Sequence, residues 1–305
     1  NPMGEFWGMA MAAKGTGALQ SAVIDSDEAR AALESAATTD SPDAPAIDVN
    51  RLKITQHEDR YTAENHEVWQ IIVKKRMAHL AEEGWGSRVF LEGAEVINLP
   101  MDNVPSLDRL NSRLYPSTGW SSFAVPGYLP AKAFFACLAE RRFPTTITVR
   151  PKSAMNYLPE PDIIHDVFGH VPLHANAAFA DFLQSWGRTT LRTNDPYHTE
   201  RLSRLFWFTV EFGLIREDGR IKLYGSGLIS SEGEGRHALE AREVERREFN
   251  LDDVCATAFD IDRYQPILYV LDSFQQLRDA MREYEELLLG SSDLGAEEPS
   301  PVTKL

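Results

Sequence analysis

Two histidines five residues apart place the strongest constraint on how this chain folds. His165 and His170 lie in the segment Pro161–Leu173, which reads PDIIHDVFGHVPL. An α-helix turns about 100° per residue, so these side chains would point about 140° apart on a regular helix. The two rings can meet only if the helix begins or bends between them. Pro159 and Pro161 favour such a start, because proline fixes φ and disfavours helix at the preceding residue.

A second constraint is a carboxylate within an apolar segment. Glu211 is the only charged residue between Leu205 and Ile215, in the sequence LFWFTVEFGLI. A buried carboxylate is costly unless it is paired, protonated or bound to a metal. The residue pattern therefore leaves two interpretations of Glu211 open, a metal ligand and a buried ion pair with an arginine.

Two histidines and one carboxylate form the facial triad of non-haem iron(II) oxygenases, which keeps coordination positions open for oxygen and substrate. A zinc site would more often contain cysteine or the HExxH spacing, and neither accompanies these histidines. From the residues alone, an iron oxygenase and a half-buried helix with two ordinary histidines and an ion-paired glutamate both remain possible.

Three segments resemble a known family. The strings PEPDIIHDVFGHVPL, FWFTVEFGL and YGSGLISSEGE are similar to motifs of the pterin-dependent aromatic amino acid hydroxylases, most of all the short bacterial phenylalanine 4-hydroxylases. The resemblance extends from Ile47 to Leu289. It implies a mononuclear iron(II) held by His165, His170 and Glu211, with tetrahydropterin and dioxygen as co-reactants.

The same resemblance implies residues that bind an amino acid. Arg150 matches the position that pairs with the substrate carboxylate, which suits the planar guanidinium fork. Asp162 lies where it would hold that arginine. Ser230 matches a residue that helps to bind the amino acid and steadies a metal-bound histidine. Leu158 departs from the threonine of the animal enzymes, which puts substrate contact at this position in doubt.

Two aromatic residues are expected to form the substrate pocket. Trp207 and Phe212 would stack on a flat apolar ring, although large aromatic side chains at helical spacing are more often core residues. Tryptophan hydroxylases resemble this motif but carry phenylalanine at the position of Trp207. The larger wall favours the smaller ring, so we expect phenylalanine as the substrate. Phe212 and Ser226, the latter often alanine in related enzymes, leave para or meta attack open.

For the pterin, the resemblance points to the loop AVPGYLP and the helix that follows it. Backbone groups of the loop would contact the bicyclic ring, a phenylalanine would stack on it, and an aspartate would reach it through water. Phe206 stands where the animal enzymes have tyrosine. The expected cofactor-binding residues are Val125, Gly127, Leu129, Phe134, Asp166 and Phe206.

The residue patterns predict a mainly α-helical fold with a minor β-sheet, as in the family's catalytic domain. We expect helices from Thr62, from Pro130, over 163–170, 176–187 and 199–213 and after Ser273, and strands at Thr145–Val149 and Ile221–Tyr224. Residues 1–46 are rich in Ala, Ser, Thr and Asp without a sustained apolar period, which indicates a disordered or loosely structured arm. The catalytic domain would span 47–289, and 290–305 would be a flexible tail. That tail lacks heptads, so a monomer is expected.

Composition limits the partners and the compartment. The net charge of −15 argues against nucleic acid and anionic membranes, and the chain has no apolar run long enough to span a bilayer. Two cysteines and the lack of a signal-peptide pattern favour the cytoplasm. The alternatives left open are tryptophan hydroxylation, phenylalanine 3-hydroxylation, a zinc-type hydrolase with the same ligands, and a non-catalytic pterin- or amino-acid-binding protein.

Overall fold

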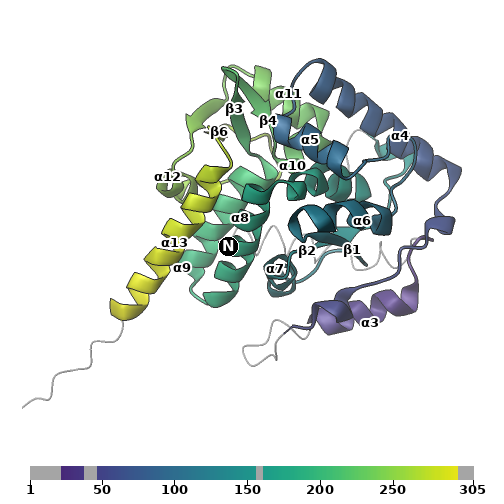
Figure 1. Ribbon diagram of the computed structural model, residues 1–305, viewed down its shortest axis with the longest axis horizontal. Helices are drawn as coiled ribbons and strands as arrows, with labels where there is room; N and C mark the ends of the chain where they lie inside the picture. Colours follow the sequence, from purple (N-terminus) through teal and green to yellow (C-terminus); the bar gives the residue numbers. More distant parts are fainter. Residues whose placement is uncertain (1–21, 38–46, 156–160, 295–305) are drawn as a thin grey trace, which may run out of the picture.

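The computed structural model describes residues 22–37, 47–155 and 161–294, with side chains described up to residue 290. It confirms a mainly α-helical fold with minor β structure (Figure 1). The α-helices are α3 (Ser26–Ala37), α4 (Ala63–Met77), α5 (Arg88–Val96), α6 (Leu107–Thr118), α7 (Ala131–Ala139), α8 (Ala177–Arg192), α9 (Pro196–Phe206), α10 (Ser226–Ser230), α11 (Glu232–Glu240), α12 (Leu251–Ala256) and α13 (Gln275–Leu294). Short 3₁₀ segments are Val49–Leu52, Glu58–Arg60, Lys152–Ala154 and Val171–Ala175, and π-helices are Ala78–Glu82, Ile164–His170 and Trp207–Glu211.

Two small sheets lie on different sides of the helical body (Figure 1). The strands are β1 (Ser121–Val125), β2 (Arg142–Thr146), β3 (Leu214–Glu217), β4 (Arg220–Leu223), β5 (Glu245–Glu248) and β6 (Ile267–Leu271). Strands β1 and β2 pair in parallel, while the second sheet has the order β4-β3-β6-β5. Asp218 and Gly219 turn the β3–β4 hairpin with φ of 50° and 75°, as a tight hairpin turn requires.

The strand expected at Thr145–Val149 begins and ends earlier in the structure. Its pairing register runs from Ser121 opposite Arg142 to Val125 opposite Thr146, so the ladder stops where β1 ends. Beyond Thr146 the backbone bonds elsewhere, because the carbonyl of Thr148 accepts from the amide of Ile163 at 2.9 Å. That bond joins the end of β2 to the segment that carries the two histidines.

The described part of the expected N-terminal arm, residues 22–37, consists mainly of the helix α3. Helix α3 buries Ala29, Ala32 and Ala36, which recur on one face. The Glu28 carboxylate also accepts hydrogen bonds from the amide and hydroxyl of Thr55, at 2.8 and 2.9 Å. The residues that recur on the buried face of this helix are alanines, whose small side chains give only a weak hydrophobic signal in the sequence. Residues 1–21 and 38–46 lie outside the described residues.

The last helix packs along α8 and α9 (Figure 1). Its buried face contains Leu277, Met281 and Tyr284, as its sequence period predicts. The helix continues to Leu294, so the first part of the expected flexible tail is helical, while residues 295–305 lie outside the described residues. None of the helices in the described ranges combines the length and apolar character that crossing a lipid bilayer requires.

Gly93 lets α5 approach the backbone just after His170. A Cβ atom at Gly93 would lie 1.9 Å from the carbonyl oxygen of Pro172, and backbone atoms cannot swing aside. We therefore expect Gly93→Ala to lower the free energy of unfolding by about 1–3 kcal/mol or more, as overpacking does. Urea unfolding of the metal-free protein measures this change.

Gly290→Ala is the matched control for this prediction. Gly290 lies in α13 with no atom within 4 Å of an added Cβ, so alanine there is expected to stabilise by up to about 1 kcal/mol through helix propensity. A Gly93→Ala protein as stable as the parent would contradict the close packing.

Candidate metal centre and active site

Two π-helices carry the expected metal ligands. His165 and His170 lie on the π-helix Ile164–His170, and Glu211 ends the π-helix Trp207–Glu211 that continues α9. A π-helix forms i→i+5 hydrogen bonds, which set residues five apart on the same side. The amide of Phe212 donates such a bond to the carbonyl of Trp207 at 2.9 Å. The expected helix start between the histidines is therefore wrong, because a wider helix brings the rings together instead.

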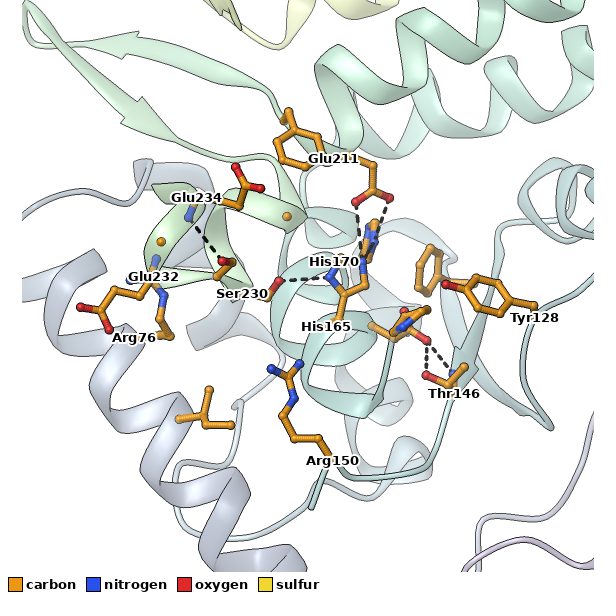
Figure 2. Close-up of a pocket in the computed structure, with 18 of the residues that line it drawn as sticks. Arg76, Tyr128, Thr146, Arg150, His165, His170, Glu211, Ser230, Glu232 and Glu234 are labelled. Atoms are coloured by element: carbon orange, nitrogen blue, oxygen red, sulfur yellow. Dashed lines mark hydrogen bonds and ion pairs between the residues drawn. The ribbon is translucent and has the colours of Figure 1, made fainter. Parts of the chain in front are cut away.

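The three side chains converge on one point (Figure 2). The Nε2 atoms of His165 and His170 are 3.3 Å apart, and the Nε2 of His170 lies 3.3 Å from Oε1 of Glu211. The Nε2 of His165 lies 3.6 Å from Oε2 of Glu211. Metal–nitrogen and metal–oxygen bonds of about 2.0–2.2 Å place neighbouring ligands about 3 Å apart at right angles. The spacing of these donor atoms thus fits one ion held on one face.

Burial and neighbouring groups shift the pKa values of two of these side chains, His165 and Glu211. Burial lowers the pKa of His165 to about 4, so its imidazole is neutral and keeps a free nitrogen lone pair. Burial alone would raise the pKa of Glu211, but the adjacent His170 and His165 and the Ser226 hydroxyl together lower it to about 2. Two imidazoles and one carboxylate are the donor set of a non-haem iron(II) site.

Helix α10 contacts both His165 and Glu211, and Figure 2 shows the contact of Ser230 with His165. The Ser230 hydroxyl donates to the carbonyl of Ser226 at 2.8 Å, so its oxygen is free to accept from the Nδ1–H of His165, 3.0 Å away. A proton held on Nδ1 leaves Nε2 as the metal-binding nitrogen. The Ser226 hydroxyl donates to Oε2 of Glu211 at 2.6 Å.

Arg150 is held by Asp162 through a two-point ion pair. The Nε and Nη2 of Arg150 donate to the two carboxylate oxygens of Asp162, at 2.8 and 2.9 Å. Asp162 is fully buried and also accepts from the amide of His165 at 3.2 Å. This pairing fixes the guanidinium plane, whose Nη1 has only a weak bond to the carbonyl of Met155 at 3.4 Å, and Arg150 lines the cavity.

One cavity of about 800 Å³ joins these groups. Its wall includes the three ligands, Arg150 and Ser230 together with the aromatic pair Trp207 and Phe212. Trp207 is fixed by a bond from its Nε1 to Oε1 of Gln265 at 3.1 Å and by stacking on Phe259 at 4.4 Å between centroids. The expected pterin residues that also line the cavity are Val125, Gly127, Leu129, Phe134 and Asp166. A metal position, a cation for a carboxylate and aromatic walls therefore open into a single space.

Comparison with known proteins agrees with this arrangement. Residues 53–292 match the family model described as biopterin-dependent aromatic amino acid hydroxylase. The chain belongs to this family. It is 40% identical over 233 residues to the phenylalanine-4-hydroxylase of Chromobacterium violaceum, covering 76% of this chain and 78% of that protein. It is 41% identical over 223 residues to the phenylalanine-4-hydroxylase of Ralstonia nicotianae, covering 73% of this chain and 71% of that protein.

Solved structures of the C. violaceum enzyme share the fold of this hydroxylase. The structure with bound iron and phenylalanine matches with a TM-score of 0.73 and 38% identity, covering 83% of this chain and 90% of that chain. The structure with iron(III) and 7,8-dihydrobiopterin matches with a TM-score of 0.74 and 39% identity, covering 80% and 88%. Iron, phenylalanine and dihydrobiopterin are thus ligands in solved structures of a relative with the same fold.

Two expected site residues of the hydroxylase, Phe206 and Asp162, are absent from the cavity lining within the described residues. The ring of Phe206 packs against that of Phe134, with centroids 6.0 Å apart. Asp162 is also absent from the lining and acts through Arg150. Leu158 lies outside the described residues.

Sequence reasoning missed several polar residues of the cavity. Thr146 donates from its amide and hydroxyl to Asp166 at 2.7 and 2.6 Å, and burial raises the pKa of that carboxyl to about 7. Glu234 lines the cavity, where burial raises its pKa to about 7. Tyr128 lies in the loop between Gly127 and Leu129 and faces the same space (Figure 2). Glu234 lies in the motif YGSGLISSEGE and Tyr128 in the loop AVPGYLP. Their membership of these two motifs was the sequence signal that could have identified them.

Proposed function

We propose that this hydroxylase converts L-phenylalanine to L-tyrosine with iron(II), tetrahydropterin and dioxygen. The observation that carries the proposal is the convergence of His165, His170 and Glu211 at 3.3–3.6 Å in a cavity shared with the Arg150 guanidinium. The names of the bacterial relatives support the same reaction. In that reaction one oxygen atom of O₂ is added to the ring and the other to the pterin.

Each group of residues has a distinct part in the proposed mechanism. His165, His170 and Glu211 would hold the iron, which would activate oxygen, and the reduced pterin would supply two electrons. Arg150 binds the substrate carboxylate through its remaining donors, since Asp162 occupies its other edge. Trp207 and Phe212 hold the ring flat and exclude water from it. These contacts would hold the substrate ring in one orientation after it binds.

The opposite wall is the proposed pterin site. Val125, Gly127 and Leu129 present backbone groups from the loop after β1, and Phe134 from α7 offers a ring face. Asp166 is held by Thr146 and would reach the pterin through water. Phe206 contributes only by supporting Phe134.

The decisive experiment loads the metal-free protein with iron(II) under anaerobic conditions, then adds tetrahydropterin, air and either phenylalanine or tryptophan. We expect tyrosine from phenylalanine and little product from tryptophan. Tryptophan as the better substrate, or meta-tyrosine as the product, would overturn the substrate or the regiochemistry. Pterin consumption without amino acid oxidation would overturn the hydroxylation, and turnover supported by zinc would overturn the iron assignment.

Trp207 is proposed to set the choice between phenylalanine and tryptophan. Trp207→Phe removes bulk from the ring wall, so we expect the ratio of kcat/KM for tryptophan over phenylalanine to rise by about 10-fold to 100-fold. Product formation from each amino acid measures the ratio. The control is Trp186→Phe, the same change in a buried tryptophan outside the cavity lining. An equal rise in both variants, or none in Trp207→Phe, would contradict this role.

We also propose that residues 47–289 form the catalytic domain, that the protein is a monomer and that it acts in the cytoplasm. The family match to residues 53–292 supports the domain, and the buried free thiols of Cys137 and Cys255 suit a reducing compartment. Light scattering coupled to size-exclusion chromatography tests the monomer, and fractionation of the source cells tests the compartment.

A further inference from the structure

Ser226 makes the shortest polar contact to a ligand of the proposed iron. It is the first residue of α10, is fully buried, and donates its hydroxyl to Oε2 of Glu211 at 2.6 Å. No other side-chain donor to this carboxylate occurs within the described ranges, apart from the histidines that face the metal position. Apart from those histidines, the Ser226 hydroxyl is therefore the side-chain group in the described ranges that holds the Glu211 carboxylate in one rotation.

Two glycines hold Ser226 against Glu211. A Cβ atom at Gly225 would lie 2.4 Å from the carbonyl oxygen of Glu211, and one at Gly227 would lie 3.1 Å from the same atom. On the other side, a Cβ at Gly169 would lie 3.0 Å from the carbonyl oxygen of Ser226. Helix α10 therefore fits between the two π-helices only because these positions lack side chains.

The remainder of α10 is also held in place. Arg76, which is buried, donates from Nε to the carbonyl of Ile229 at 2.9 Å and from Nη2 to the carbonyl of Leu228 at 3.1 Å. Ser230 links back to the carbonyl of Ser226 and contacts His165 (Figure 2). A single short helix, fixed at both ends, thus contacts a ligand on each π-helix.

The two oxygens of Glu211 consequently have different surroundings. Oε1 lies 3.3 Å from Nε2 of His170. Oε2 is directed to Ser226 and lies further, 3.6 Å, from Nε2 of His165. A carboxylate without such a partner can rotate and offer either oxygen, or both, to a metal ion.

We propose that Ser226 is a positioning residue that reserves Oε2 of Glu211 and directs Oε1 to the metal. The carboxylate then occupies one coordination position and leaves the others for the co-reactants. This inference rests on the proposed function only for the identity of the metal as iron.

The test compares Ser226→Ala with the parent and with Ser203→Ala. Ser203 is also buried, but its hydroxyl donates to the carbonyl of Thr199, away from the ligands. Iron(II) affinity of each metal-free protein is measured by competition with a chromophoric chelator. We expect Ser226→Ala to bind iron about 10-fold to 100-fold more weakly, as loss of a residue supporting a metal ligand does, and Ser203→Ala to bind within about twofold of the parent.

A second readout separates positioning from general loosening of the fold. Each protein is loaded with cobalt(II), whose visible absorption reports the number and arrangement of ligands. The Ser226→Ala spectrum is expected to differ from the parent spectrum, and the Ser203→Ala spectrum to match it. Ser226→Thr keeps a hydroxyl on the same Cβ and is expected to restore both affinity and spectrum.

Several results would overturn the inference. These are unchanged iron affinity with an unchanged cobalt spectrum in Ser226→Ala, equal losses in Ser203→Ala, or a threonine variant that folds yet behaves like alanine. Failure of the proposed function would be seen differently, as a parent protein that binds iron but makes no tyrosine. The iron affinities and cobalt spectra of the Ser226 variants would still test the positioning role in that case.

Discussion

Glu211→Gln is expected to abolish stable iron binding and, with it, tyrosine formation. Glutamine keeps the size of the side chain but removes the only negative charge among the three ligands, so the charge of a divalent ion is left uncompensated. We expect iron affinity and kcat each to fall by more than about 100-fold, the upper end of the cost of losing a mere supporting residue. Chelator competition and a tyrosine assay measure the two effects.

Glu232→Gln provides the matched control for that substitution. Glu232 lines the same cavity but pairs with Lys75 at 2.6 Å and is part of no ligand cluster in the described residues. We expect this variant to keep its iron and its activity. Retention of iron by Glu211→Gln at the level of the Glu232→Gln control would show that Glu211 is not a ligand.

Arg150→Lys is expected to cause the second large loss, mainly by raising KM for phenylalanine. Lysine cannot form the two-point contact with Asp162 and at the same time present further donors to the substrate. The buried Asp162 carboxylate would keep only part of its partners. Disrupting one member of a buried charge pair costs about 2–5 kcal/mol, which corresponds to roughly 30-fold to several thousand-fold in kcat/KM.

Two controls accompany Arg150→Lys. One substitutes another arginine of the cavity, and the other measures the binding of a ligand without a carboxylate. Arg236 lines the cavity and pairs with Glu232 at 3.4 Å, so Arg236→Lys is expected to have little effect on KM. Phenylethylamine lacks the carboxylate, so its weak binding is expected to be the same for the parent and Arg150→Lys. A similar loss for both ligands would mean that Arg150 supports the fold and does not recognise the carboxylate.

The cluster of His165, His170 and Glu211 was predictable from the sequence because its signals are local. Glu211 stands alone in an apolar run, and the two histidines share a short proline-flanked segment. The type of helix was not predictable from these local signals, and the π-helix also packs closely against α10 beside Gly169. That contact joins segments far apart in the chain, which no local pattern records.

Other differences also arise from tertiary contacts. The period of Ala29, Ala32 and Ala36 was present in the sequence, but alanine is a weak apolar signal without its neighbours in view. The strand at Thr145–Val149 was displaced because the end of β1 fixed the register. Ser226 was noted only for departing from a common alanine, and its bond to Glu211 becomes visible only when the two residues are placed together.

The two π-helices make the site depend on the number of residues between ligands as well as on their identity. A π-helix of this kind differs from an α-helix by about one added residue in a turn. Substitutions at Val167 or Phe168 leave that number unchanged, whereas winding the same number of residues as an α-helix would turn the ring of His170 about 140° from that of His165. Chimeras of related hydroxylases should therefore be joined outside residues 164–170 and 207–211, so that the number of residues in each π-helix stays the same.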